Sequence, residues 1–505
     1  MKIAIYHTTD LHGYVFPTDY VNYKEQGMLK ILSFIDEDKK SYDNSLILDG
    51  GDLIQGSAMT NYLYKHEFDI NPITNLVREA EYNAVILGNH EFNYGLDYLY
   101  KSYKSIQDLL LNANIEGLDL ESKPYRIFDL DGTNISVFGI TTSYIPNWEQ
   151  AKNIEGIVFH DPVEMYAKYE KEMIDNSDYI IVLYHGGFEK SIDGKFIPTE
   201  KLNKENQASE LLEKFESIDI ILSGHQHRSF ITKINDVICS QPLNNGQNFT
   251  KIVIDTESDD IEYELVDVTE NHFTINEKYA SLFDDINEKL DIYLKEIIGK
   301  LDKDILIDNK FEARLHGHPL INLLQEVQIE ISGADFSTTT LFDTAIGFDK
   351  DVSIRDVLVN YPYPNTLRVL EIKGSDLKWA IEISSSYFLL DDEDNIIVNP
   401  KYIFPKKRNY KYDFFYGLDY VVDLKRPIGE RVISMRRDGK DIDMDKNYSI
   451  VINNYRASNT TEYPPYEDKK TIKEINIDMS ELLINYFEKH KEIKVNERVN
   501  FKFIK

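Results

Sequence analysis

The chain has 505 residues, which is long for a single hydrophobic core and favours two domains. Its content of 42% hydrophobic, 12% aromatic and 28% charged residues is typical of a globular protein and excludes wholesale disorder. The 56 basic and 87 acidic residues give a formal charge of −31, which opposes binding to long nucleic acids or to an anionic membrane surface.

From residue 1 to about 270, short apolar runs of β type alternate with segments of helical period, which predicts a layered α/β domain. The predicted strands include residues 2–6, 45–48, 84–87, 179–184 and 218–222. We therefore assign residues 1–272 to a first domain.

Apolar residues repeat at helical spacing between about 273 and 300, which predicts a linker helix with Gly299 as its C-terminal stop. Residues 301–505 are richer in tyrosine and contain β-type runs at 431–435 and 448–452. This change in composition and pattern predicts a second, α+β domain.

The N-terminal residues MKIAIYHTTD lack the apolar run and the cleavage site of a signal peptide, and no later stretch predicts a membrane span. The single cysteine, Cys239, cannot form an internal disulfide. We expect a cytoplasmic protein without a membrane partner, with an export segment upstream of this sequence as the alternative.

The loops that follow the predicted strands carry side chains of the metal-ligand type. These are Asp10 and His12 after the first strand, Asp52 after the second, Asn89 after the third, and His185, His225 and His227 after the last two. Each one alone is more typical of a structural residue than of a ligand. Because functional groups gather beyond the carboxyl ends of strands in α/β sheets, their coincidence favours a shared metal site.

Seven ligand-type side chains exceed the coordination number of one ion, so we expect two divalent metals that share a carboxylate. Asp52 is the natural bridge, and Asp49 is expected to support its turn. Imidazole, carboxylate and amide ligands favour Mn²⁺ or Zn²⁺, with Fe, Co or Mg as alternatives. His90 adjoins Asn89 and is predicted to be catalytic, since adjacent residues rarely point to one centre.

The motifs DLHG, GGDLIQGS, GNHEFNYG, HGG and GHQH together resemble the calcineurin-like metallophosphoesterases, specifically the two-domain 5'-nucleotidase family. YPYPNTL, YKYDFFYGLDY and NNYRAS resemble that family's C-terminal domain. The resemblance implies a four-layer α/β/β/α catalytic domain and a C-terminal substrate-binding domain. It also implies two metals, with these ligands: Asp10, His12, Asp52 and His227 for one, and Asp52, Asn89, His185 and His225 for the other.

The family's catalytic histidine matches His90, and in many 5'-nucleotidases an aspartate three residues later orients it. This chain has Asn93 there. The form of these motifs is similar to the branch that hydrolyses 2',3'-cyclic nucleotides and 3'-nucleotides, so we expect that activity, with 5'-nucleotidase activity as the close alternative. A phosphatase for non-nucleotide esters and a nucleotide-binding protein without turnover are further alternatives.

In the C-terminal domain the resemblance implies two aromatic side chains that sandwich the base of a small nucleotide substrate, matched by Tyr410 and Tyr455. Tyr412 is close enough to be the match instead of Tyr410. Arg456 is predicted to contact an anionic substrate, although a structural role is the alternative. After Arg456 the chain reads SNTTEYPP where a glycine-rich turn is usual in the family. We expect a monomer or weak oligomer.

Overall fold

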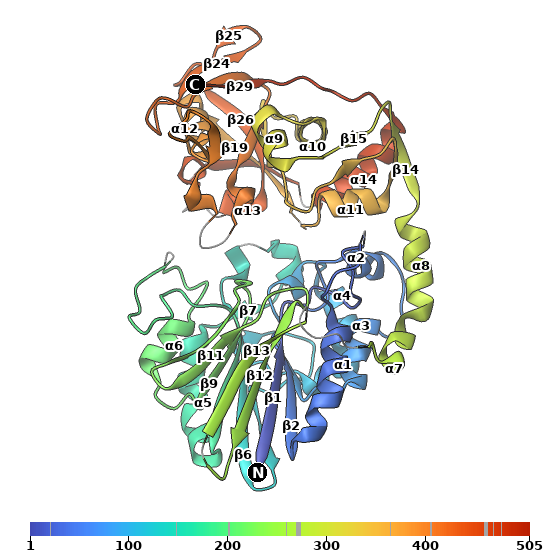
Figure 1. Ribbon diagram of the computed structural model, residues 1–505, viewed down its shortest axis with the longest axis vertical. Helices are drawn as coiled ribbons and strands as arrows, with labels where there is room; N and C mark the ends of the chain where they lie inside the picture. The colour runs from blue at the N-terminus through green and yellow to red at the C-terminus, as the bar shows by residue number, and fades with distance from the viewer. Residues whose placement is uncertain are drawn as a thin grey trace. The chain divides into compact units, whose positions relative to one another are not determined.

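The computed structural model describes residues 1–20, 22–147, 149–199, 202–258, 260–268, 274–363, 365–403, 407–458, 463–467, 469–475 and 477–505. The chain forms two compact units, Met1–Asp291 and Ile292–Lys505 (Figure 1). The domain boundary expected at residues 272 and 273 lies outside the described residues.

The first unit contains two sheets, with strand orders β13-β12-β1-β2-β3 and β10-β11-β9-β8-β6-β5. The strands of the first sheet are β1 (Lys2–Thr8), β2 (Asn44–Asp49), β3 (Ala84–Val85), β12 (Asn248–Asp255) and β13 (Asp260–Asp267). Those of the second are β5 (Tyr125–Leu130), β6 (Thr133–Thr141), β8 (Tyr179–His185), β9 (Ile220–Ser223), β10 (Phe230–Ile234) and β11 (Val237–Gln241).

The two sheets pack face to face through one apolar core. Ile3 and Ile5 of β1 belong to the same buried cluster as Ile181 and Leu183 of β8. The spacing of two residues in each pair follows from the alternation of side chains along a strand.

Helices cover the outer faces of both sheets. Helix α5 (Pro162–Asn176) and helix α6 (Ala208–Lys214) pack on the second sheet. Helix α1 (Met28–Asp38) lies against the first sheet, where Tyr6 donates a hydrogen bond of 2.7 Å to Asp38 (Figure 1). The predicted four-layer α/β/β/α architecture is therefore confirmed.

Parallel pairing directs the strands that precede the ligand loops toward common edges. β1 pairs with β2 and β2 with β3 in parallel, and β8 pairs with β9 in parallel. All five predicted strands are present with slightly different ends, and the carboxyl ends within each sheet lie on one side.

The predicted linker helix ends earlier than expected. Helix α7 (Glu277–Ala280), a 3₁₀ turn (Ser281–Phe283) and helix α8 (Asp284–Leu294) are followed by strand β14 (Ile297–Leu301). Gly299 lies in this strand opposite Val352, so its predicted role as a helix stop is wrong. A Cβ at Gly299 would meet Phe487 at 3.0 Å, which shows that this glycine serves close packing.

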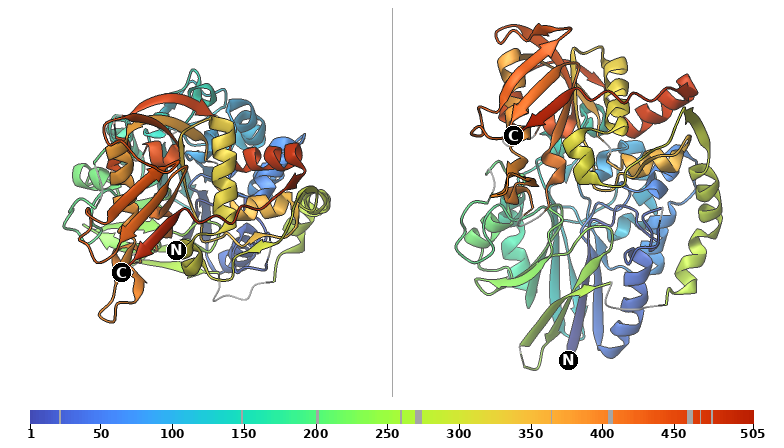
Figure 2. Two further views of the ribbon diagram at one scale, coloured as in Figure 1. Left: turned by 90° about the horizontal axis from the view of Figure 1, so that it is seen from above. Right: turned by 45° about the horizontal axis from the view of Figure 1, so that its top comes forward.

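The second unit combines a five-stranded sheet of order β22-β16-β26-β19-β27 with a four-stranded sheet of order β25-β24-β23-β29. The larger sheet consists of β16 (Phe336–Thr340), β19 (Leu367–Lys373), β22 (Asp413–Tyr416), β26 (Asn447–Asn453) and β27 (Lys470–Ile475). The smaller consists of β23 (Asp419–Asp423), β24 (Val432–Arg437), β25 (Lys440–Asp441) and β29 (Phe501–Ile504). Helix α10 (Pro319–Ser332), yellow in Figure 2, runs beside these strands, which confirms the α+β class.

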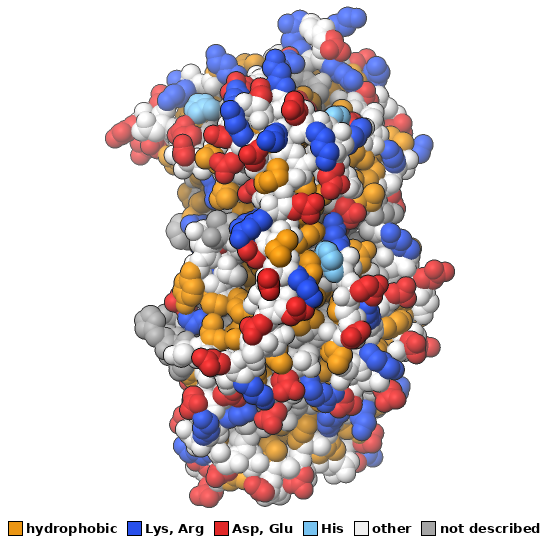
Figure 3. Space-filling view, turned by 90° about the vertical axis from the view of Figure 1, so that its right-hand side faces the viewer, with side chains coloured by type: hydrophobic (Ala, Val, Ile, Leu, Met, Phe, Trp, Pro, Cys, Tyr) orange, Lys and Arg blue, Asp and Glu red, His pale blue; other side chains and the backbone are white. Residues whose placement is uncertain are grey.

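Acidic and basic side chains are interspersed over the face shown in Figure 3. The net charge of −31 is therefore not gathered into one acidic area on that face. Among the described residues, no helix combines the length and apolarity needed to cross a bilayer.

Candidate dinuclear metal site

Sharp turns follow the strands that carry the proposed ligands. Five ligand residues adopt a left-handed backbone, namely Asp10 (φ 53°), His12 (φ 49°), Asp52 (φ 58°), His225 (φ 71°) and His227 (φ 51°). Residues other than glycine rarely adopt this conformation, which costs about 1–3 kcal/mol each and clusters at functional sites. The turns bring side chains from distant segments to one place.

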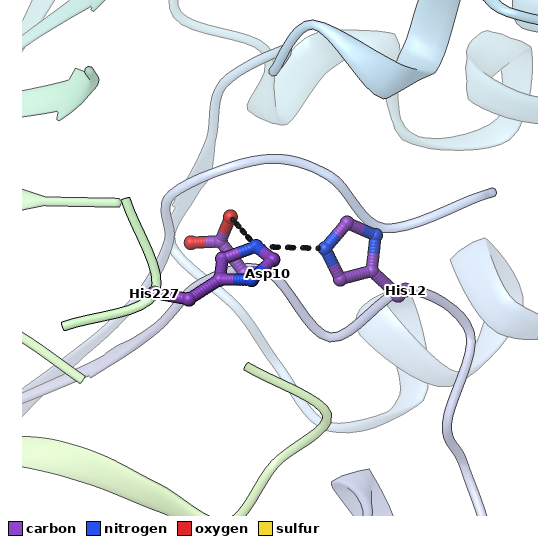
Figure 4. A group of neighbouring side chains, drawn as sticks. All are labelled: Asp10, His12 and His227. Carbon is purple, nitrogen blue, oxygen red and sulfur yellow. Dashed lines mark hydrogen bonds and ion pairs between the residues drawn. The ribbon is translucent and has the colours of Figure 1, made fainter. Parts of the chain in front are cut away.

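Asp10, His12 and His227 form one group whose ligand atoms lie within 4.8 Å of one another. The side chains point toward one another in Figure 4. His227 Nε2 is 3.2 Å from His12 Nε2 and 3.2 Å from Asp10 Oδ1. His12 Nδ1 donates to the Gln55 carbonyl at 2.9 Å, so the lone pair of its Nε2 faces the group.

A second group joins Asp10, Asp52 and His185, again within 4.8 Å. His185 Nδ1 donates to the Gly50 carbonyl at 2.6 Å, which directs Nε2 to Asp52 Oδ2 at 3.2 Å. Asn89 Oδ1 lies 3.1 Å from His185 Nε2 and 2.8 Å from His225 Nδ1. Both histidines thus converge on the amide oxygen of Asn89.

Asp52 differs from Asp10 in how its oxygens are used. Asp10 Oδ2 accepts a hydrogen bond of 2.7 Å from Thr9, and both Asp10 oxygens lie 3.1 Å from the His225 amide nitrogen. Asp52 Oδ1 accepts from the His90 amide at 2.7 Å, whereas the buried Asp52 Oδ2 accepts no well-aligned hydrogen bond and faces His185 Nε2 at 3.2 Å. A buried carboxylate oxygen of this kind is costly unless a cation binds it, so the donor set fits divalent metals.

Burial and the charges of neighbouring side chains together shift the pKa values of the proposed ligands. Burial lowers the pKa of His12 to about 4. Burial also lowers the pKa of His185, but the charge of Asp52 outweighs it and raises the pKa to about 10. Although burial raises the pKa of Asp52, His185 holds it well below its usual range. A cation at this position would therefore compete with the His185 proton.

His90 lies beside the ligands, in the 3₁₀ turn His90–Phe92. Its Nε2 is 3.9 Å from Asp52 Oδ2, and its Nδ1 is 2.6 Å from Asn93 Oδ1. The side chain is 30% exposed, whereas that of Asp52 is 1% exposed. His90 therefore borders both the ligand cluster and solvent.

Two residues of the second loop set its shape. Asp49 Oδ1 accepts the Gly51 amide at 3.0 Å, which confirms its predicted support of the turn. A Cβ at Gly88 would lie 2.2 Å from Asp52 Oδ1 and 2.6 Å from His185 Cε1. Glycine is thus required where the second, third and fourth loops meet.

Three carboxylates that support the site were not predicted from the sequence. Glu91 is fully buried and accepts the backbone amides of Asp52 (2.9 Å), Leu53 (2.6 Å) and Gly88 (2.6 Å), which ties two ligand loops together. Glu149 accepts from Asn93 at 2.6 Å, and Glu205 lies 3.3 Å from His225 Nε2. Only Glu91 had a sequence signal, because it lies inside the GNHE motif.

The second unit brings Tyr410 and Tyr455 together, with ring centroids 6.5 Å apart. The rings are inclined by 77°, so they do not form the parallel slot that a sandwiched base requires. Tyr455 is 41% exposed. Tyr412, the alternative match, is 1% exposed and packs against Tyr387, so it belongs to the core.

Arg456 is buried and paired, and is not positioned to contact a substrate as the sequence predicted. It is 2% exposed, and its Nε donates to Asp413 Oδ2 at 3.0 Å. The guanidinium also donates to the Tyr410 carbonyl and lies 4.2 Å from the centre of the Tyr463 ring. Arg456 therefore holds the tyrosine-bearing loops together. Residues 459–462 of the loop after it lie outside the described residues.

The fold and the site define a metal-dependent phosphoesterase. Residues 3–229 match the calcineurin-like phosphoesterase family, and residues 297–468 match the 5'-nucleotidase C-terminal domain. A candidate 5'-nucleotidase from Staphylococcus aureus, solved as a crystal structure, is 36% identical with a TM-score of 0.87 and full coverage of both chains. The chain thus belongs to the 5'-nucleotidase family of calcineurin-like phosphoesterases and is a hydrolase of nucleotide phosphoric esters.

Two curated relatives also align over most of the chain. The 2',3'-cyclic-nucleotide 2'-phosphodiesterase/3'-nucleotidase of Haemophilus influenzae is 25% identical, covering 100% of this chain and 88% of that protein. The trifunctional nucleotide phosphoesterase YfkN of Bacillus subtilis is 26% identical over 98% of this chain. The present chain spans only 38% of that second relative. Calcineurin-like phosphoesterases use a dinuclear divalent metal centre, for which the two groups above provide ligands.

Proposed function

We propose that this chain hydrolyses 2',3'-cyclic nucleotides and 3'-nucleotides, with 5'-nucleotides as the alternative substrates. The observation that carries the proposal is the convergence of the seven proposed ligand side chains beside His90, whose partner is Asn93 rather than a carboxylate. The full-length similarity to the Haemophilus influenzae enzyme supports the cyclic-nucleotide branch. The similarity to the candidate Staphylococcus aureus 5'-nucleotidase supports the alternative.

In this proposal Asp10, His12, Asp52 and His227 hold one metal. Asp52, Asn89, His185 and His225 would hold the other, so Asp52 would be the residue common to both sets. Mn²⁺ and Zn²⁺ suit this mixture of imidazole and oxygen ligands. When bound, two such cations stabilise charge on the phosphoryl oxygens and activate the attacking water for in-line displacement.

His90 acts on the leaving group. Its Nδ1 is held by Asn93, so its Nε2 faces the ligand cluster at 3.9 Å from Asp52 Oδ2. From this position the protonated imidazole donates a proton to the departing alkoxide oxygen. His12 and His185, by contrast, hold their Nδ1 on backbone carbonyls and direct Nε2 into the ligand cluster, which suits ligation rather than proton donation.

A panel of phosphate-release assays tests the substrate branch. Purified protein is supplied with Mn²⁺ or Zn²⁺ and given 2',3'-cyclic, 3'- or 5'-nucleotides. We expect the highest kcat/KM with the cyclic and 3'-nucleotides. A clear preference for 5'-nucleotides would replace the proposed branch by its alternative. Binding of a nucleotide without release of phosphate from any of them would show a protein without turnover.

The two tyrosines test whether the substrate is a nucleotide. We expect Tyr410→Ala and Tyr455→Ala each to raise KM for nucleotides, since stacking on a base contributes about 1–3 kcal/mol. Tyr263→Ala, at an exposed tyrosine of strand β13, is the matched control. An unchanged KM in both variants would favour a phosphatase for non-nucleotide esters.

A further inference from the structure

A chain of three side chains leads from the candidate site into the protein. His90 Nδ1 lies 2.6 Å from Asn93 Oδ1, and Asn93 Nδ2 donates to Glu149 Oε2 at 2.6 Å. Glu149 follows the 3₁₀ turn Ile145–Asn147 and is 56 residues distant from Asn93 in sequence. Asn93 thus lies between an imidazole and a carboxylate.

The surroundings of Glu149 fix the direction of these hydrogen bonds. Its other oxygen, Oε1, accepts from the Gln150 amide at 2.7 Å and from Asn153 Nδ2 at 2.9 Å. Burial raises the pKa of Glu149, whereas the donors Gln150, Asn93 and Asn153 oppose the rise. These three partners donate, so the ionised carboxylate, which can only accept, fits them best.

The orientation of the Asn93 amide follows from this carboxylate. An amide has a donor end and an acceptor end, and Glu149 accepts only from the donor end. The carbonyl end of Asn93 must then face His90, where it accepts a proton from Nδ1. His90 Nε2 is thereby kept on the side of the ligand cluster and is the nitrogen that exchanges protons with the substrate.

We propose that Glu149 is a positioning residue for His90, acting through Asn93 in place of a carboxylate in direct contact with the histidine. This inference rests on the proposed function. In the step it assists, the oxygen of the attacking water bonds to phosphorus and the water loses a proton to solvent, while the bond between phosphorus and the leaving oxygen breaks and its electron pair stays on the leaving oxygen. The oxygen takes the Nε2 proton of protonated His90, which becomes neutral and keeps its Nδ1 proton on Asn93. Solvent then restores the proton, since His90 is 30% exposed.

Glu149→Gln is the most informative variant because the neighbouring donors favour one orientation of the new amide group. The Gln150 and Asn153 donors on one side favour its oxygen there, which directs its NH₂ group toward Asn93. Asn93 must then turn round and present its own NH₂ group to His90. The proton of neutral His90 is expected to move from Nδ1 to Nε2.

We expect Glu149→Gln to lower kcat for nucleotides by about 10- to 100-fold, the usual effect of removing an outer-shell partner, with little change in KM or in metal content. Hydrolysis of p-nitrophenyl phosphate should fall far less, because its leaving group needs no proton. Glu155→Gln is the matched control, since Glu155 is an exposed residue in the same segment. An equal loss for both substrates would overturn the positioning role.

A double-mutant cycle with Asn93→Asp separates positioning from packing. The new carboxylate at position 93 accepts from His90 Nδ1 directly, and the amide created by Glu149→Gln can donate to it. In this background Glu149→Gln should no longer lower kcat. A loss of the same size in both backgrounds would indicate a merely structural role for Glu149.

The ¹⁵N chemical shifts of the His90 ring provide a readout independent of turnover. They are recorded on the zinc-loaded protein, with His90→Gln used to assign the signals. We expect the proton on Nδ1 in the unaltered chain and on Nε2 in Glu149→Gln. Identical shifts in the two proteins would overturn the inference, whereas failure of the proposed function would appear separately, as no phosphate release from nucleotides by the unaltered chain.

Discussion

At the scale of single residues, the site depends on backbone conformations that most side chains avoid. Five proposed ligands have φ between 49° and 71°. Such conformations persist only where the surroundings enforce them. Three of the five are held by their amides, since that of Asp52 donates to the buried Glu91 and those of Asp10 and His12 donate to the backbone carbonyls of Gly51 and Asp52.

Asp52→Asn is expected to weaken metal binding at both positions, since Asp52 is the proposed shared ligand and its buried carboxylate would lose its charge. Metal content after gel filtration, measured by elemental analysis, should fall below that of the unaltered chain. His90→Gln is the comparison variant, because His90 is assigned to catalysis rather than to ligation. Full retention of metal by Asp52→Asn would contradict the shared-ligand assignment.

Glu91→Gln is expected to destabilise the first unit. The new NH₂ group would oppose either the backbone amide of Leu53 at one oxygen position or those of Asp52 and Gly88 at the other, and an unsatisfied buried polar group costs about 1–3 kcal/mol. Urea unfolding measures this change. Glu121→Gln, at an exposed residue, should unfold like the unaltered chain. If both variants have the same midpoint, Glu91 does not support the loops as the structure indicates.

At the scale of elements, a buried ion pair links strand β22 to helix α13 (Asn454–Ser458). Asp413 and Arg456 are 5% and 3% exposed at their side chains, and the guanidinium also binds the Tyr410 carbonyl. One ion pair thus connects both segments that carry the proposed base-stacking tyrosines. Arg456, buried in this pair, would therefore affect a substrate through the positions of these tyrosines rather than by direct contact.

Asp413→Asn should lower the free energy of unfolding by about 3–5 kcal/mol, because it leaves the Arg456 charge buried without its counter-ion. Asp419→Asn is the matched control. It breaks the exposed pair Asp419–Arg498, whose N–O distance is 2.7 Å, and such pairs contribute about 0–1 kcal/mol. Denaturant titration measures the free energy of unfolding of both variants. Equal losses of this free energy would show that the buried pair contributes no more than the exposed pair.

At the scale of the whole molecule, the chain consists of two compact units, and all seven proposed ligands belong to the first. Metal held by these residues would therefore stabilise the native state of the first unit directly. The second unit has its own sheets and its own buried ion pair.

Calorimetry with and without metal tests this division. We expect two thermal transitions, of which only one moves to higher temperature when Mn²⁺ replaces a chelator. Binding at a hundredfold excess over Kd contributes about 2.7 kcal/mol. His185→Ala should abolish the shift. A single transition that moves as a whole would show that the units unfold as one.

The sequence by itself determined the features that depend on residues close together in the chain. Alternating apolar residues predicted the strands, and the ligand-type residues after them predicted where the loops converge. The helix end was missed because residues 297–301 continue an apolar pattern that serves strand β14 instead. Helical spacing and strand alternation both accommodate so short a run.

Only the tertiary structure showed which side chains form hydrogen bonds and ion pairs with the predicted site residues. Glu91 and Asp52 are 39 residues apart, and Glu149 and Asn93 are 56 apart, so no local pattern links them. Burial likewise separated Tyr412, a core residue, from Tyr410, and showed that Arg456 is paired with Asp413. The chemistry of a ligand is encoded in its residue type, whereas its hydrogen-bond partners and exposure depend on which distant segments the fold brings together.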